Sequence, residues 1–517
     1  MLSAILLAWL GVSAAASPAA PGGAARLLAY DRDGKLLDKE GFLALIGRAD
    51  RKPGAEQKPP LLVSAPDGLS GGVDFQLAQE GGMLVLRWER LRKVRLSLPW
   101  PVEEDGFSTV WADNGGEGYA DGAVIALNQD IALTQRRLFA QSWKKRTTDW
   151  EPLYKPGGKA KSQADKSKEA VAEAGAEKDP AKRAAAFDAA LKETSLAWQK
   201  MLYEHGLQNA ENPKLKDSLR FGLTLDDELP KHLDSYEWVV DMVERSGTNW
   251  VRLVFRPNPS DFAFAKRASF NEYDSIVHAL RAKGIRIMGC VLDTAHWPRT
   301  RTPQAYAART RNLALHFSRE IRSWEVGSEL NGDWLGGARQ PMGLDQAFRV
   351  YAAGAKAVKA VEPSLETVAT LYWWDSTAPD YDHSLEGWLK RFVPEGFGKN
   401  LDVAAVSLWP EDNPVGMAFE RPFELLHDAL PDKRVMLGSL GYVERTEVKG
   451  YWWLDPSDVD GARKDLVILY TATSCAMPRS LCGGFWWQTL EQMLPPADEK
   501  PTDLFNVYKR NLDQLGR

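Results

Sequence analysis

Cysteine and histidine are scarce in this chain of 517 residues, which contains three of the former and seven of the latter. No pair among them has the spacing of zinc ligands, so the sequence predicts no metal site and no other cofactor. An excess of positive charge is also missing, because 65 Lys and Arg face 70 Asp and Glu, for a formal net charge of −5. Without a basic field the chain is not expected to bind nucleic acid.

Long apolar runs are missing as well. The run nearest the N-terminus extends from Ala4 to Val12, far short of the about 20 residues that a membrane span needs. Small residues follow from Ser13 to Pro18, which is typical of a cleaved export signal, although an uncleaved anchor is the alternative. The sequence therefore predicts a signal peptide at residues 1–16, export to the periplasm or beyond, and no stable membrane insertion after cleavage.

The three cysteines leave the disulfide pattern open. Cys475 and Cys482 are close enough in sequence to form a short disulfide loop in an oxidising compartment, and Cys290 falls in an apolar strand. The alternative is that all three cysteines are buried thiols.

Residues 26–135 have the pattern of a small all-β domain. Short alternating runs such as 84–88 and 94–98 are separated by Gly and Asp turns, which predicts a β-sandwich-like domain. The loop Asp113–Gly118 carries oxygen ligands that could hold a cation, but a plain turn is the favoured interpretation and we assign it no metal.

Residues 136–215 form a helical segment with a low-complexity insertion. Residues 155–182 contain no aromatic side chain and consist mainly of Lys, Ala, Glu, Ser and Gly, so they are expected to form a solvated insertion or linker. Helical periodicity then extends from Ala184 to Tyr203, with an expected end at Gly206.

Residues 216–517 repeat a unit of strand, loop and helix. The candidate strands are Leu219–Thr224, Trp250–Phe255, Ile285–Leu292, Ile321–Ser328, Glu366–Leu371, Val403–Leu408, Val435–Leu440 and Cys482–Trp487. Apolar strands alternating with amphipathic helices favour a parallel sheet covered by helices, and eight units of this length predict an α/β fold, the (β/α)8 TIM barrel. An open doubly wound sheet is the alternative, but no Gly-rich phosphate fingerprint follows any strand.

Tryptophan collects where the strands from the third to the eighth end. A sugar ring has an apolar C–H face and polar hydroxyl edges, so indoles beside carboxylates suit saccharides. Packing in the core is the alternative for each of them, and in a Trp-Trp pair only one ring can face the pocket. The expected substrate-binding tryptophans are Trp297, Trp334, Trp373, Trp409 and Trp487.

The fourth strand carries the sharpest local signal, the segment from Trp324 to Asn331. Alternation places Glu325, Gly327 and Glu329 on one side of the strand, with Glu329 at the mouth of the barrel. A carboxyl group partly desolvated by tryptophan can act as a general acid, so Glu329 is the leading catalytic candidate. A solvated glutamate that caps the next loop is the alternative.

These residues resemble the clan A glycoside hydrolases, over about residues 219–495. The resemblance implies a retaining glycosidase on an eightfold barrel, with Glu329 as acid/base and Ser328 where the family has Asn. It also places Arg252 beside the nucleophile and makes Trp487 similar to the eighth-strand tryptophan. Ser439 stands at the position of the family's nucleophilic Glu, and Ser407-Leu408-Trp409 replaces its His-x-Tyr.

Three hypotheses follow from this pattern. The first is an exported glycoside hydrolase for polysaccharide or oligosaccharide, with Glu329 as general acid and a second carboxylate as base, in an inverting geometry. The second is a non-catalytic carbohydrate-binding protein on the same barrel. The third treats the barrel as a scaffold for an N-terminal domain that contacts other envelope proteins. Candidates for the second carboxylate are led by Asp293 and Glu444 and include Asp226, Asp375, Glu411 and Glu491.

Overall fold

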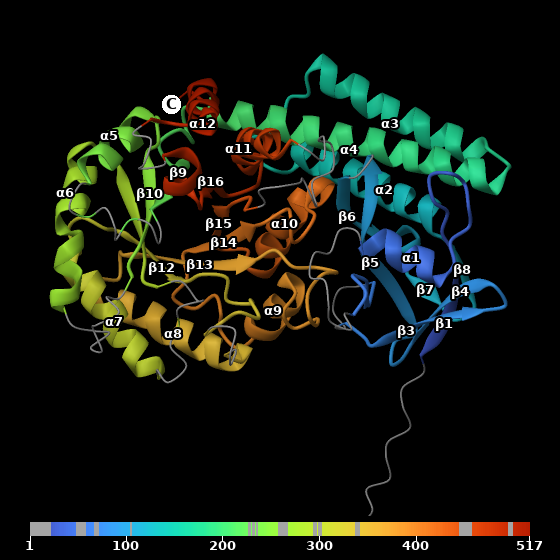
Figure 1. Cartoon of the computed structure of the whole chain (residues 1–517), viewed down its shortest axis with the longest axis horizontal. Coiled ribbons are helices and arrows are strands. Elements are labelled where there is room, and N and C mark those ends of the chain that lie inside the picture. The colour runs from blue at the N-terminus through green and yellow to red at the C-terminus, as the bar shows by residue number, and fades with distance from the viewer. Residues whose placement is uncertain are drawn as a thin grey trace, which may run out of the picture.

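The chain folds into a closed barrel and an N-terminal part built on two small sheets, as the computed structural model in Figure 1 shows. The structure describes residues 22–47, 58–66, 72–103, 106–225, 229, 233, 236–256, 267–292, 297, 302–336, 342–443, 458–494 and 500–516. None of the helices in these ranges is both long and apolar enough to cross a membrane.

The barrel has eight parallel strands, which close in the order β10-β11-β12-β13-β14-β15-β16-β9. The strands are β9 (Arg220–Leu225), β10 (Trp250–Val254), β11 (Arg286–Cys290), β12 (Ser323–Gly327), β13 (Glu366–Tyr372), β14 (Val403–Leu408), β15 (Arg434–Leu440) and β16 (Ser480–Trp486). Each lies within two residues of the predicted bounds. The closed order of parallel strands confirms the predicted barrel. Its physical reason is that apolar strands of this kind must be covered on both faces.

Helices surround the barrel on its outer face (Figure 1). They are α5 (Glu237–Arg245), α6 (Asp274–Ala282), α7 (Pro303–His316), α8 (Leu344–Val361), α9 (Leu385–Phe392), α10 (Glu420–Ala429), α11 (Val459–Ser474) and α12 (Asp503–Gln514), with the short helices η3 (Arg267–Tyr273), η5 (Gly416–Phe419) and η6 (Thr489–Met493). Gly247 and Gly284 follow α5 and α6 with φ values of +84° and +77°. This left-handed conformation ends both helices.

The N-terminal part contains two sheets that share one buried core. One sheet has the order β3 (Phe75–Glu80), β4 (Met83–Trp88), β1 (Gly23–Leu28) and β8 (Ala123–Ala126); the other contains β2 (Leu62–Ser64), β5 (Lys93–Glu103), β6 (Gly106–Ala112) and β7 (Tyr119–Ala120), and α1 (Lys39–Gly47) packs nearby. This agrees with the sandwich-like prediction. The loop after β6 forms the short helix η1 (Asn114–Gly116), and Asp113, which precedes it, pairs with Arg137. Within the described ranges no cluster of His, Cys, Asp and Glu could hold a metal ion.

Three helices follow these sheets: α2 (Leu127–Thr148), α3 (Gly158–Ala176) and α4 (Pro180–Ala210). The expectation of a solvated linker over residues 155–182 is wrong, because α3 packs along α4 (Figure 1). Ala160 and Ala174 are buried, and the hydroxyls of Ser167 and Thr194 are 2.8 Å apart. Small side chains let α3 approach closely and use the apolar face of α4, so the segment needs no core of its own.

The expected end of a helix at Gly206 is also wrong, since α4 continues to Ala210. A Cβ atom at Gly206 would lie 2.1 Å from the carbonyl oxygen of Ala472 in α11. The glycine therefore serves a close approach between two helices and does not end one.

A buried polar cluster joins the helices of the N-terminal part to the barrel. Arg146 of α2 is fully buried and its guanidinium lies 2.7 Å from the Glu420 carboxylate of α10. The indole N–H of Trp198 donates to the same carboxylate at 2.8 Å, and His205 Nδ1 lies 3.0 Å from Arg146 Nη1. Arg146 also donates to the Ala476 carbonyl, inside the loop that the Cys475–Cys482 disulfide closes. Of the two alternatives for Cys475 and Cys482, the structure has the disulfide. Cys290 is a buried cysteine that takes no part in a disulfide.

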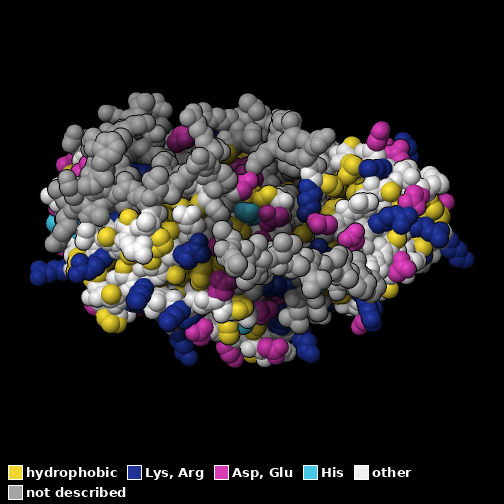
Figure 2. Space-filling view, turned by 90° about the horizontal axis from the view of Figure 1, so that it is seen from below, with side chains coloured by type: hydrophobic (Ala, Val, Ile, Leu, Met, Phe, Trp, Pro, Cys, Tyr) yellow, Lys and Arg dark blue, Asp and Glu magenta, His cyan; other side chains and the backbone are white. Residues whose placement is uncertain are grey.

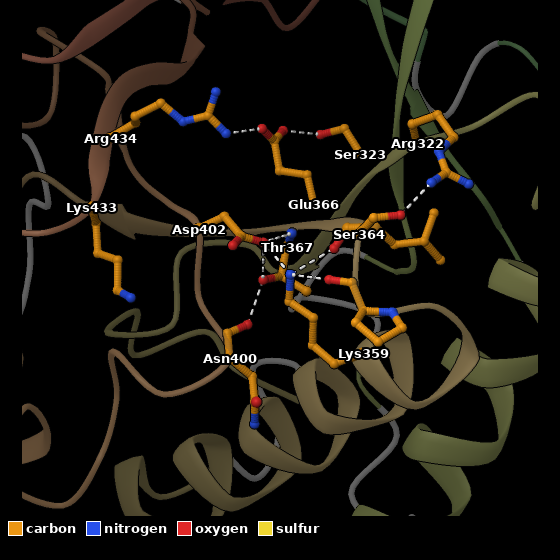
Figure 3. Close-up of polar contacts among 12 residues, drawn as sticks. Arg322, Ser323, Lys359, Ser364, Glu366, Thr367, Asn400, Asp402, Lys433 and Arg434 are labelled. Carbon is orange, nitrogen blue, oxygen red and sulfur yellow. Dashed lines mark hydrogen bonds and ion pairs between the residues drawn. The ribbon is translucent and has the colours of Figure 1, made fainter.

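Polar contacts also hold the N-terminal ends of the barrel strands together (Figure 3). The Glu366 carboxylate at the start of β13 receives hydrogen bonds from Ser323 at 2.7 Å and from Arg434 at 2.5 Å. Lys359 of α8 binds Asp402 at 2.5 Å, and Asp402 accepts the Thr367 N–H at 2.8 Å. Because this end of the barrel is occupied by structural ion pairs, the opposite end is the place to look for a site.

Candidate functional site

Glu329 follows β12 in a strained backbone conformation, with φ at +53°. Two local contacts hold it there: the Leu330 N–H donates to Thr370 O at 3.2 Å, and the Asn331 side chain exchanges hydrogen bonds with the Tyr372 backbone at 2.7 and 3.0 Å. A non-glycine residue kept in this region often marks a functional position. The structure thus places Glu329 at the C-terminal end of the barrel, where the sequence predicted it.

Two indoles accompany the Glu329 carboxylate. Trp409, directly after β14, donates its Nε1–H to Glu329 Oε1 at 3.0 Å. Its ring lies 6.3 Å from that of Trp487 in an edge-to-face arrangement. Both rings are partly exposed. A carboxylate and two partly exposed indoles therefore meet at one place in the mouth.

Arg252 lies beneath this group. Its guanidinium is 4.8 Å from the Trp487 ring centroid, while its Nε donates to Glu325 Oε2 at 2.7 Å and its Nη2 donates to Ser328 at 3.2 Å. Thr370 donates to the other oxygen of the Glu325 carboxylate, and the side chains of Arg252 and Glu325 are fully buried. The charge of Arg252 is thus matched by Glu325 of β12, which sequence reasoning had placed on this side of the strand without a role.

Ser439 is buried on β15, at the position of the expected nucleophile. In the register of the two strands Ser439 pairs with Ser407 of β14, and neither hydroxyl has a hydrogen-bond partner among the described residues. A serine needs a base at hydrogen-bond distance to become a nucleophile. The described part of the site offers Ser439 no such base.

The other candidate carboxylates have separate surroundings. Asp375 is buried against the N-terminal part, where it accepts a hydrogen bond from Ser97, and burial raises the pKa of its carboxyl group. Glu411 is fully buried and accepts the Val443 N–H at 2.6 Å. Glu491 of η6 lines a cavity of about 330 Å³ with residues of α11 and α12, outside the barrel. The remaining candidates, Asp226, Asp293 and Glu444, lie outside the described residues.

Two of the predicted substrate-binding tryptophans lie in the core instead. Trp297 is 1% exposed, donates to Leu292 O at 3.2 Å and packs 5.0 Å from Tyr306. Trp373 is also 1% exposed and belongs to the large buried cluster. Trp373 directly follows β13, and alternation with Tyr372 turns its ring away from the barrel interior. The burial of both rings in the core opposes the predicted role in ligand binding.

Trp334 forms a second aromatic group, which sequence reasoning had not separated from the first. Its ring lies 4.9 Å from Tyr372 and 5.3 Å from Trp374. Burial raises the pKa of Tyr372 well above its usual range, and the nearby carboxylates of Asp412, Glu329 and Glu411 add to this rise. Tyr372 thus contacts the aromatic group and is close enough to three acidic side chains, Glu329 among them, to feel their charge.

Charges of both signs are mixed over the face of the molecule in Figure 2, which fits the absence of a basic field in the sequence. The mouth itself differs from this surface. Its described charged groups include the matched pair of Arg252 and Glu325, the acidic side chains around Tyr372, and Arg256 after the end of β10.

No protein-family model matches the sequence, and a comparison with curated proteins finds no relative. Several solved structures are similar in fold. A family 1 β-glucosidase from Thermotoga maritima is 12% identical, with 55% of this chain and 87% of that chain covered and a TM-score of 0.41. The β-glycosidase BGL167 is 12% identical over 57% of this chain and 97% of its own, with a TM-score of 0.44. At these values the barrel assignment rests on the strand order of the chain itself.

Proposed function

We propose that the protein binds saccharides at the mouth of its barrel. Trp409 and Trp487 are the platform for the apolar face of a sugar ring, and Glu329 accepts hydrogen bonds from its hydroxyl edge. The observation that carries this proposal is the contact of Trp409 Nε1 with Glu329 Oε1 at 3.0 Å, which holds a partly exposed indole and a carboxylate together in one place. Flat aromatic faces beside fixed polar groups suit a molecule that has both kinds of surface.

Binding without turnover is the form of this function that the geometry supports best. The retaining mechanism needs a carboxylate nucleophile about 5 to 5.5 Å from the acid/base group. Ser439 stands at the nucleophile position without a base beside its hydroxyl, and the charge of Arg252 is matched by Glu325. A glycosyl-enzyme ester therefore has no described group to form it.

An inverting glycoside hydrolase is the second candidate. The strained backbone of Glu329, φ +53°, favours it, because strain is often kept where a side chain must reach a reacting bond. In this mechanism Glu329 protonates the leaving oxygen and Asp293 or Glu444 activates water from a distance of about 6.5 to 9.5 Å.

The protein acts outside the cytoplasm in this proposal, in the periplasm or the extracellular space, on polysaccharide or oligosaccharide. The signal-like segment at residues 1–16 and the Cys475–Cys482 disulfide support export, since disulfides persist in oxidising compartments. Sequencing the N-terminus of the mature protein tests this directly; a chain that retains residue 1 in the cytoplasm contradicts it.

Binding is tested by calorimetric titration with neutral tetrasaccharides of glucose, galactose and mannose. We expect Trp409→Ala to weaken binding at least tenfold, which corresponds to about 1.4 kcal/mol. The control is Trp150→Phe. Trp150 is a tryptophan outside the mouth, and its ring packs 6.0 Å from that of His427 on the outer helix α10.

Reducing-sugar release is measured in the same samples. Binding without release supports the binding protein, whereas release that disappears in Glu329→Gln establishes the hydrolase. No binding by any of the tested sugars or their acidic counterparts would refute the saccharide function.

A further inference from the structure

Two groups of buried polar side chains lie on the barrel strands near the mouth. On β10, β12 and β13, Arg252, Glu325 and Thr370 are buried and bonded to one another. On β14, β15 and β9, Ser407, Ser439 and Thr224 are equally buried, at 0%, 2% and 0% exposure. The hydroxyl oxygens of this second group have no hydrogen-bond partner among the described residues.

These three hydroxyls lie on the strands that surround the platform. Ser407 pairs with Ser439 across β14 and β15, and Thr224 pairs with Arg252 across β9 and β10. The strand between β15 and β9 is β16, which leads directly to Trp487, while β14 leads to Trp409. The unpartnered hydroxyls are therefore below and beside the two indoles.

Buried hydroxyls without partners cost free energy, and most such groups in native proteins are bonded to protein, water or ligand. A hydroxyl both donates and accepts, so a set of them matches the hydroxyls of a sugar ring. Their position under a stacking platform makes the ring of a bound sugar a suitable partner.

The charges of the described mouth indicate which sugars fit. Arg252, the cation beneath the platform, is matched by Glu325 at 2.7 Å. The carboxylates of Glu329, Glu411 and Asp412 all act on Tyr372. The described cation that follows β10, Arg256, lies close to Tyr273 of η3. Among the described groups that face the platform, an anionic sugar would meet carboxylates and a cation that is already matched by Glu325.

We propose that Ser407, Ser439 and Thr224 form a hydroxyl subsite that binds the ring hydroxyls of a neutral sugar and selects neutral saccharides over sugar acids. This inference rests on the proposed saccharide function and names the class of ligand and the residues that select it. It assigns Ser439 a role in recognition in place of the nucleophilic role that its position suggests.

The test compares affinities for two sets of probes, measured by calorimetry. The neutral probes are tetrasaccharides of glucose, galactose and mannose, and the acidic probes are tetramers of galacturonate and mannuronate. We expect at least one neutral probe to bind tenfold or more tightly than every acidic probe. We also expect Ser407→Ala and Ser439→Ala each to weaken that binding 5- to 20-fold while the melting temperature stays constant or rises.

Ser195→Ala is the matched control, because Ser195 of α4 is also fully buried with an unpartnered hydroxyl, away from the barrel mouth. This variant should bind like the parent protein. Unchanged affinity in both Ser407→Ala and Ser439→Ala would show that water fills the subsite and would overturn the inference. Equal or tighter binding of the acidic probes would overturn it too, and would leave the saccharide function standing. If no probe of either set binds, the saccharide function itself fails.

Discussion

Arg252 has close contacts on several sides, with a carboxylate, a hydroxyl and an indole face. A fully buried ion pair is stable only when its geometry is good and its remaining hydrogen bonds are made, and loss of one partner leaves a buried charge. The contact with Trp487 adds a cation–π interaction, which fixes the ring from below. At the scale of single residues, this arginine positions the platform.

Replacing Arg252 by lysine should therefore affect ligand binding as well as stability. A lysine ammonium cannot lie flat under the indole while it donates to both Glu325 and Ser328. We expect Arg252→Lys to weaken saccharide binding about tenfold and to shift tryptophan emission, measured by fluorescence titration and spectra.

Arg309→Lys is the control for this change. Arg309 is 1% exposed, donates to two backbone carbonyls at 2.9 and 3.1 Å and lies over Phe270. Its replacement should lower the free energy of unfolding without changing affinity. Equal losses of affinity in both variants would mean that Arg252 has only a structural role.

The helix α4 shows how one residue without a side chain sets the packing of whole elements. It contacts α2, α3 and α11, and at Gly206 the α11 backbone comes too close for any Cβ atom. The same helix packs against α3, the low-complexity segment, and buries Ala160, Ser167 and Ala174. The packing of α3 and α11 thus depends on their contacts with α4.

Gly206→Ala should lower the free energy of unfolding by about 2 to 3 kcal/mol, because two helix backbones would have to separate. Gly175→Ala, in α3, should have the opposite effect. Nothing lies within 4 Å of a Cβ at Gly175, and alanine favours the helix by about 0.5 to 1 kcal/mol. Urea denaturation of both variants measures the difference; the same sign in both would contradict this account of α4.

At the scale of the whole molecule, the two parts of the chain are joined around His205. Its Nε2 lies 3.1 Å from Pro152 O, and its Nδ1 accepts from the Arg146 guanidinium at 3.0 Å. Arg146 in turn binds Glu420 of the barrel. This arrangement suits a neutral imidazole and opposes a charged one. Burial, together with the charge of Arg146, lowers the pKa of His205 to about 4.

The junction should therefore weaken in acid. Between the lowered pKa and the ordinary value near 6.5, the unfolded chain binds a proton at this histidine that the folded chain does not bind. The contribution of His205 to stability is fully present above about pH 6.5 and falls as the pH is lowered toward 4. The loss of this contribution between pH 7 and pH 5 amounts to roughly 2 kcal/mol.

His205→Gln removes this titration. On going from pH 7 to pH 5, its free energy of unfolding should therefore fall by about 2 kcal/mol less, or rise by about 2 kcal/mol more, than that of the parent. Asp188 titrates in the opposite sense, because burial raises its pKa to about 6, and it does so in both proteins. His278→Gln is the control variant, because His278 is an exposed histidine of α6 that lies outside the junction. Parallel pH profiles for parent and His205→Gln would refute the assignment.

The barrel could be predicted because its evidence is local. Each strand is a short apolar run and each helix has an apolar stripe, so the alternation is visible along the chain without knowledge of any distant contact. The position of Glu329 at a strand end followed from the same pattern. The helix α3 could not be predicted this way, because its burial depends on α4 and not on its own composition.

In the site, too, some features follow from the local sequence and others depend on distant contacts. Which residue types gather at the mouth follows from the strand ends, but the partner of a buried charge is a contact between distant positions. Arg252 and Glu325 are 73 residues apart, and only packing around the closed barrel brings them together. The direction of each tryptophan is settled likewise, since Trp409 enters the mouth while Trp297 and Trp373 enter the core. Periodicity along a chain specifies its elements, whereas burial and charge matching between elements depend on all of them at once.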